Sequence, residues 1–320
     1  MKIRTIFKKT CGFFDFVRRV VFKPVFAGVK KVKRILRKIF SIKSTRSLSG
    51  DFGNILFLTL MSIAMIIPIL YVINNAFKPL DELFLYPPRF FVANPTLDNV
   101  KDLFSLMSTS WVPMSRYLFN TVFVTATGTF FHIIFASMAA YVLEKHDFYG
   151  RKIFFSIVVL TLMFSPTVTM IPNFVVMSQL RLVDTYWALI LPAIGSSLGL
   201  FLMKQFMCNV HNSLLEAAKI DGAGEFTTFW KIVMPNVRSA WLTLMIFSVQ
   251  ALWNSTGGVL IRSEELKPLT YALNQVTAGG IARAGASAAV SLVVMSVPIF
   301  VFIISQSNIL DTMATSGIKE

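Results

Sequence analysis

Residues 213–235 have types and a spacing that suggest binding chemistry. This stretch reads SLLEAAKIDGAGEFTTFWKIVMP and lies between two long apolar segments. Its small and charged residues include Glu216, Ala217, Ala218, Asp221 and Gly222. They suit recognition of a partner, because small side chains allow close approach and a carboxylate can bind a cation.

The same stretch carries helix signals. Ser213 and Glu216 have the spacing of a capping box, which predicts a helix starting at Ser213. Gly222 stands where a helix end needs a left-handed residue. A second helical pattern begins near Glu225 and ends at Pro235, with one apolar stripe formed by Phe226, Phe229, Trp230 and Val233. We therefore predict two short helices joined by a glycine elbow, docked on a partner or lying at a membrane interface.

Catalytic and metal-binding patterns are missing from the sequence. The three histidines are scattered, and Cys11 and Cys208 have no metal-site spacing. His132 is expected to pack between helices. The chain also has no G-x-x-x-x-G-K-[ST] phosphate loop, so it cannot bind ATP in that mode. We predict that the chain is not an enzyme and binds no cofactor itself.

The apolar segments are long enough to cross a membrane. A spanning helix needs about 20 apolar residues, and a charge at the bilayer centre is costly. Hydrophobic residues make up 55% of the chain, and six windows contain no Asp, Glu, Lys or Arg: Phe52–Phe77, Tyr117–Leu143, Ile153–Leu180, Tyr186–Met203, Ser239–Ile261 and Ala286–Ile304. We predict an all-α integral membrane protein with six transmembrane helices.

Five prolines fall inside four of these windows, at positions 68, 166, 172, 192 and 298. Proline removes a backbone donor and kinks a helix. Such a kink is compatible with ordinary packing of bent helices, and equally with a path lined by broken helices.

The charges are unevenly distributed. Of the 31 Lys and Arg residues, 15 lie in residues 1–50 beside a single acid, Asp15. The excess of basic residues predicts that both termini are cytoplasmic. We predict a basic amphipathic arm over 1–50 that binds membrane lipid rather than nucleic acid, a six-helix domain over 51–310 with a cytoplasmic loop at 204–238, and a tail over 311–320.

The loop residues carry a family resemblance. Glu216-Ala217-Ala218, then Asp221-Gly222-Ala223, then Ile232 and Pro235, resemble the EAA motif of permease subunits from ATP-binding-cassette (ABC) importers. The stretches IPNFVVMSQLRLVDTYWALILPA (171–193) and FLMKQF (201–206), with Trp253-Asn254, are similar to the carbohydrate, maltose-permease-like branch. The resemblance covers roughly residues 52–317.

The resemblance implies the type I ABC importer fold, a bacterial plasma membrane location and a set of partners. The partners are a second, different permease subunit, two cytoplasmic ATPases that hold ATP and Mg, and an extracytoplasmic solute-binding protein. It also implies that the loop is the coupling helix, with Glu216 facing a basic groove of the ATPase, Gly222 as the elbow, and Ala217 and Ala218 as a small face.

The cargo implied is a sugar or oligosaccharide. Amides and aromatic rings hold neutral sugars, and Gln250, Trp253 and Asn254 can share one helix face. The same three side chains could instead join helices by packing and hydrogen bonding. The competing function is a secondary carrier or channel for a neutral solute, although such a carrier usually buries a charged residue that these windows lack.

Overall fold

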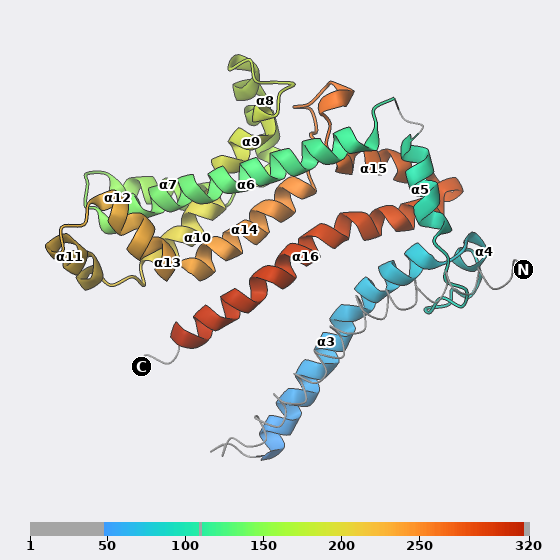
Figure 1. Ribbon diagram of the computed structural model, residues 1–320, viewed down its shortest axis with the longest axis horizontal. Coiled ribbons are helices and arrows are strands. Elements are labelled where there is room, and N and C mark those ends of the chain that lie inside the picture. The colour runs from blue at the N-terminus through green and yellow to red at the C-terminus, as the bar shows by residue number, and fades with distance from the viewer. Residues whose placement is uncertain (1–47, 109–110, 317–320) are drawn as a thin grey trace, which may run out of the picture. The chain divides into compact units, whose positions relative to one another are not determined.

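The computed structural model describes residues 48–108 and 111–316, and every regular element in that part of the chain is a helix (Figure 1). The arm predicted for residues 1–50 therefore lies almost wholly outside the described residues. The chain divides into two compact units, residues 1–67 and 68–320, and the boundary falls inside the first helix of the described part, Leu48–Phe77.

Most helices follow one another with short connections, and the longer ones are residues 84–97 and 254–268. They are α3 (Leu48–Phe77), α4 (Leu80–Leu83), α5 (Asp98–Ser108), α6 (Met114–Lys145), α7 (Arg151–Thr161), α8 (Pro166–Gln179), α9 (Trp187–Ile194), α10 (Ser197–Met207), α11 (Asn212–Ile220), α12 (Glu225–Thr228), α13 (Met234–Asn236), α14 (Arg238–Trp253), α15 (Leu269–Thr277) and α16 (Ala284–Ser316). A π-helical turn spans Phe229–Val233, and 3-10 turns span Glu264–Leu266 and Gly280–Arg283. Helix α16 continues into the region predicted as the tail.

Four helical segments in the described part are long and apolar enough to cross a membrane: Phe52–Phe77, Met114–Lys145, Trp187–Met207 and Ala284–Gln306. They coincide with four of the six predicted windows. Two bent helix pairs could raise the number of spans to six. The prediction of an all-helical membrane protein is thus confirmed, and the two remaining windows take a different form.

The third window is broken. Helices α7 and α8 meet at 114°, so Ile153–Leu180 is not one continuous helix. The break lies at Ser165-Pro166, where Pro166 begins α8 and Ser165 Oγ accepts a hydrogen bond from Thr167 N at 3.4 Å. Proline cannot donate to the preceding turn, and a serine before it caps a new helix. The proline in the sequence therefore marks a helix boundary.

The fifth window is shorter than predicted. Helix α14 ends at Trp253, whereas the window continues to Ile261. Gly257 and Gly258 follow with φ of +77° and +49°, values that favour glycine and do not continue a right-handed helix. Residues 254–268 therefore form a loop, with a 3-10 turn near its end, at the far end of α14.

Helix α6 is the centre of the second unit, since it packs against α9, α10 and α14, while α14 also packs against α16. A buried polar contact joins α6 to α14, where His132 Nδ1 lies 2.6 Å from Ser248 Oγ. His132 is 4% exposed, in agreement with a packing histidine. Its ring fits against α10 because residue 199 is glycine: a Cβ at that position would lie 2.1 Å from His132 Nε2.

We expect Gly199→Ala to destabilise the bundle, because the His132 ring is buried and held by Ser248 and cannot move aside freely. Overpacking of this kind costs about 1–3 kcal/mol, which should lower the apparent unfolding temperature in detergent by a few degrees. Gly195→Ala is the control, since its added Cβ would meet nothing closer than 3.8 Å. Adding His132→Ala to Gly199→Ala should relieve the clash. Equal stability of the two glycine variants would contradict the prediction.

The Asp184 carboxylate connects the loop between α8 and α9 to the loop that follows α14. Asp184 Oδ1 accepts hydrogen bonds from Arg262 N at 2.9 Å and Ser263 N at 2.8 Å, and Oδ2 accepts from the Ser263 hydroxyl. These bonds hold the pKa of Asp184 below its usual value, with the Ser263 hydroxyl as the largest cause. A carboxyl with a depressed pKa stabilises the fold above its unfolded pKa and loses that effect as pH falls through the folded pKa.

We expect Asp184→Asn to speed hydrogen–deuterium exchange at the Arg262 and Ser263 amides at pH 7, because an amide cannot replace the full carboxylate pattern. The difference from wild type should narrow as pH falls below 3.8, the ordinary aspartate value, and should disappear below the depressed pKa of folded Asp184, where the wild-type carboxyl is protonated too. Asp147→Asn is the matched control, because that side chain is 98% exposed and lies elsewhere in the unit. A difference independent of pH would contradict this account.

Candidate interface helix and its elbow

Helix α11 ends at the glycine predicted from the sequence. Gly222 has φ +78°, and the chain reverses there. Gly222 N donates to Lys219 O at 3.1 Å, and Ala223 N donates to Ala218 O at 2.9 Å. This pair of bonds is the Schellman motif, in which a left-handed residue satisfies the last carbonyls of a helix. The predicted elbow is confirmed.

The predicted start of α11 is wrong. The helix begins at Asn212 after His211, and no side-chain bond caps it, so Ser213 lies inside the first turn. The start is set by a neighbouring helix: Lys145 at the end of α6 donates to Val210 O at 2.5 Å and to Asn212 Oδ1 at 3.2 Å. The contact with α6, not the predicted capping box, therefore sets the start of α11.

The two faces of α11 differ. Leu215 and Ala218 are 8% and 4% exposed and point into the chain. Glu216, Ala217 and Lys219 are exposed, and Ile220 is 86% exposed. The two alanines therefore lie on different faces: Ala218 lets α11 approach the rest of the chain closely, and Ala217 alone is open to a partner.

The second half of the elbow begins at Glu225, as predicted, and continues to Asn236, one residue past Pro235. Its middle is the π-helical turn Phe229–Val233. Pro235 has no N–H for the carbonyl four residues earlier, which favours a wider turn at this point. Phe229 and Val233 are buried, whereas Phe226 is 72% exposed, so only part of the predicted apolar stripe faces the protein.

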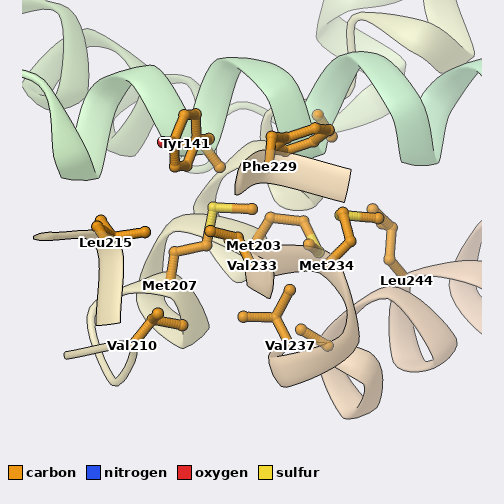
Figure 2. Packing of buried hydrophobic residues seen from close by; sticks show 13 residues of the cluster. Tyr141, Met203, Met207, Val210, Leu215, Phe229, Val233, Met234, Val237 and Leu244 are labelled. Carbon is orange, nitrogen blue, oxygen red and sulfur yellow. The ribbon is translucent and has the colours of Figure 1, made fainter. Parts of the chain in front are cut away.

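A buried cluster anchors the elbow to three spans (Figure 2). Leu215 of α11 and Phe229, Val233 and Met234 of the second half pack against side chains of α6, α10 and α14: Tyr141, Met203, Met207 and Leu244. Burying a large apolar side chain contributes about 1.5–3 kcal/mol. The elbow is therefore fixed to the bundle, so a force on α11 would be passed to α6, α10 and α14.

Glu225 connects the two halves of the elbow to α6. Its Oε2 accepts a hydrogen bond from Tyr141 Oη at 2.9 Å and lies 3.7 Å from His146 Nε2. Its Oε1 lies 3.2 Å from Lys219 Nζ on α11. Glu225 thus holds α11 against the end of α6. Nothing in the sequence links Tyr141 to a residue 84 positions away, and sequence reasoning missed this contact.

The predicted cargo residues do not form one surface. Trp253 is 5% exposed, and its Nε1 donates to Val294 O of α16 at 3.1 Å. Its carbonyl accepts from Thr270 Oγ1 at 2.6 Å. Trp253 therefore holds a packing position, whereas Gln250 and Asn254 are exposed. Within residues 48–108 and 111–316, no group of three His, Cys, Asp or Glu side chains is placed to hold a metal.

Comparison with known proteins agrees with this architecture. Residues 132–311 match the family described as binding-protein-dependent transport system inner membrane component. The chain is similar to the protein LplC of Bacillus subtilis (strain 168), at 34% identity over 71% of this chain and 75% of LplC. It is also similar to that organism's polygalacturonan/rhamnogalacturonan transport system permease protein YtcP, at 33% identity over 69% and 75% of the two chains.

A solved structure has the same fold. It is that of a bacterial ABC transporter involved in the import of the acidic polysaccharide alginate, with a TM-score of 0.68 and 23% identity, over 83% of this chain and 99% of that one.

The helical fold, the spans and the anchored elbow define a membrane-embedded transport component. The chain belongs to the family of inner membrane components of binding-protein-dependent transport systems and is an ABC importer permease subunit rather than an enzyme. The resemblance drawn from the elbow motif is confirmed. The alternative of a secondary carrier or channel is not favoured.

We expect Glu225→Ala to loosen α11, because it removes the hydrogen bond to Tyr141 and the ion pair to Lys219 together. Exposed ion pairs contribute about 0.2–1 kcal/mol, so amide exchange in α11 should rise roughly two- to fivefold. Glu216→Ala is the matched control, because Glu216 has no hydrogen bond or ion pair among the residues that the structure describes. Unchanged α11 exchange in Glu225→Ala would show that the buried cluster alone holds the helix.

Proposed function

We propose that this chain is the permease subunit through which an ATP-driven, binding-protein-dependent importer carries a sugar or oligosaccharide. In this proposal α11 is the coupling helix that receives the motion of a cytoplasmic ATPase. The observation that carries the proposal is the two-sided character of α11. One face is buried against the spans, and the other presents Glu216, Ala217 and Ile220 to the outside.

The proposed coupling residues have separate roles. Glu216 offers a carboxylate to a basic groove, and charge-assisted hydrogen bonds of this kind are stronger than neutral ones. Ala217 keeps the exposed face thin enough for close approach. Asp221 and Gly222 end the helix and turn the chain back toward the bundle, so that motion of α11 reaches α6, α10 and α14.

The assembly proposed around the chain follows the family. A second permease subunit, a different chain, completes the pathway, and two ATP-binding subunits hold ATP and Mg on the cytoplasmic side. An extracytoplasmic solute-binding protein delivers the cargo. The chain lies in a bacterial plasma membrane with both termini cytoplasmic, and the basic arm over 1–50 binds membrane lipid, not nucleic acid.

The carbohydrate cargo is supported by the named relative that transports polygalacturonan and rhamnogalacturonan, and by the fold likeness to an alginate importer. Gln250 and Asn254 are the candidates for cargo contact, because both are exposed at the end of α14. Trp253 would act by holding that end of α14 against α16.

We expect Glu216→Gln to weaken capture of the ATPase. Losing the charge from one side of an interfacial charge pair commonly costs about 2 kcal/mol or more, which corresponds to at least about thirtyfold in affinity. The measurement is co-purification with the ATPase together with sugar uptake into intact cells. Both should fall, while the chain still reaches the membrane.

Asp102→Asn is the control for this experiment, since it makes the same change at an exposed carboxylate on α5, outside the elbow. Full ATPase capture by Glu216→Gln, or uptake that continues after ATP depletion with the ion gradient intact, would overturn the proposal.

A further inference from the structure

A pocket of 520 Å³ lies beside the loop that follows α14. Helix α8 contributes Met170, Ile171 and Phe174, and the loop contributes Ile261, Arg262 and Lys267. Helix α14 separates this loop from the elbow: α11–α13 gather at one end of α14, and α15 lies beyond the other (Figure 1). Sixteen helical residues rise about 24 Å, so the pocket is well removed from the proposed ATPase contact.

The pocket combines an apolar wall with two cations. Arg262 lies over the Phe174 ring, 5.9 Å from its centroid, and Lys267 Nζ lies 3.5 Å from the centroid of the Tyr271 ring. Aromatic faces attract cations and fix their position without neutralising them. None of the ion pairs in the described part of the chain includes either cation.

Two of the nearby acids have other hydrogen-bond partners, and Glu265 is exposed to solvent. The Asp184 carboxylate accepts its hydrogen bonds from Ser263 and from the backbone of Arg262, and the Arg262 side chain adds only a weaker electrostatic attraction. Glu264 accepts a hydrogen bond from Tyr117 Oη at 2.7 Å. No acidic side chain is among the residues that line the pocket. The two cations therefore leave the pocket positively charged and able to accept an anion.

The complementary ligand has a carboxylate beside a flat apolar face. A sugar acid in its pyranose form meets both requirements: its C–H face can lie on Phe174, and its carboxylate can bind Arg262 and Lys267. A guanidinium pairs with a carboxylate in a two-pronged geometry that an isolated hydroxyl cannot reproduce. A neutral sugar would have to desolvate both cations without neutralising them, which disfavours it. The volume is in the range typical of small-ligand sites.

We propose that this pocket, the Arg262 pocket, binds carboxylate-bearing sugar units and selects acidic oligosaccharides over neutral ones. The inference rests on the proposed function in that the cargo is a carbohydrate. Arg262 and Lys267 are the specificity-determining residues, and Phe174 supplies the stacking surface. A lipid phosphate shares the anionic chemistry and is the competing occupant that the experiment must separate.

The test uses the full-length chain in nanodiscs of zwitterionic phosphatidylcholine, with no ATPase present. The two probes are trigalacturonate and its fully methyl-esterified form, which has the same sugar skeleton without the charges. Binding is measured by ligand-observed NMR titration. We expect trigalacturonate to bind at least about tenfold more tightly than the ester, because each charge-assisted contact contributes about a factor of ten.

Arg262→Gln and Lys267→Gln should each lose most of this preference, and the double variant should bind the two probes equally. Lys101→Gln is the matched control, since that exposed lysine lies on α5 and pairs with Asp98. Unfolding temperatures verify that each variant is folded, which we expect because Arg262 is exposed and Lys267 is only partly buried. Equal affinity of wild type for the two probes, or an unchanged preference in both single variants, would overturn the proposal.

Two further arms separate the anion sources. Inorganic phosphate is added as a competitor, and the titration is repeated in nanodiscs containing anionic phosphatidylglycerol. Displacement of trigalacturonate by either one at comparable concentration would assign the pocket to a phosphate or a lipid headgroup and overturn the proposal. Retained binding in both arms supports it. Because no ATPase is involved, failure here leaves the test of Glu216 unaffected, and failure of Glu216 leaves this assay unaffected.

Discussion

The apolar cluster under the elbow is the constraint on which the rest of the structure depends. An isolated helix as short as α11 is unstable in water, so α11 must gain its stability from packing. Leu215 supplies one side of that packing, and Phe229 and Val233 supply the other. The left-handed turn at Gly222 allows both halves to reach the same cluster. Without the cluster, the exposed face of α11 would have no fixed direction.

The bundle that carries the elbow combines closely packed helices with breaks in the helical backbone. Close packing is clearest where α6, α10 and α14 meet, since a glycine leaves room for a buried histidine ring. Breaks lie at Pro166 and after Trp253, where the chain leaves the regular helix. In a membrane, irregular backbone is tolerated where protein or water satisfies it. Asp184 does this for the loop after α14 by accepting two backbone N–H groups.

The two candidate contact regions lie at opposite ends of α14. At one end, the elbow carries the exposed carboxylate of Glu216. At the other end, the Arg262 pocket presents two cations and an aromatic wall. A rigid helix between them is a direct mechanical connection, because a packed helix moves as a unit. Under the proposed function, a cytoplasmic event at the elbow would change access to a cargo route at the far side.

Features that depend only on neighbouring residues could be predicted from the sequence. Four spans followed from uncharged apolar windows, because the cost of burying a charge in lipid does not depend on the fold. The glycine elbow followed from the preference of glycine for positive φ. The family resemblance was also local, since it came from the spacing of Glu216, Asp221 and Gly222.

Tertiary structure alone decided the features that join distant parts of the chain. Lys145 donates a hydrogen bond to Asn212 at the start of α11, and Tyr141 donates one to Glu225. Trp253 donates one to a backbone carbonyl of α16. The Arg262 pocket likewise needs α8 beside a loop that comes some 80 residues later. Periodicity and capping patterns cannot predict such pairs, because the local sequence is compatible with many possible partners for each side chain. Only the packing of α6, α10 and α14 selects one of them.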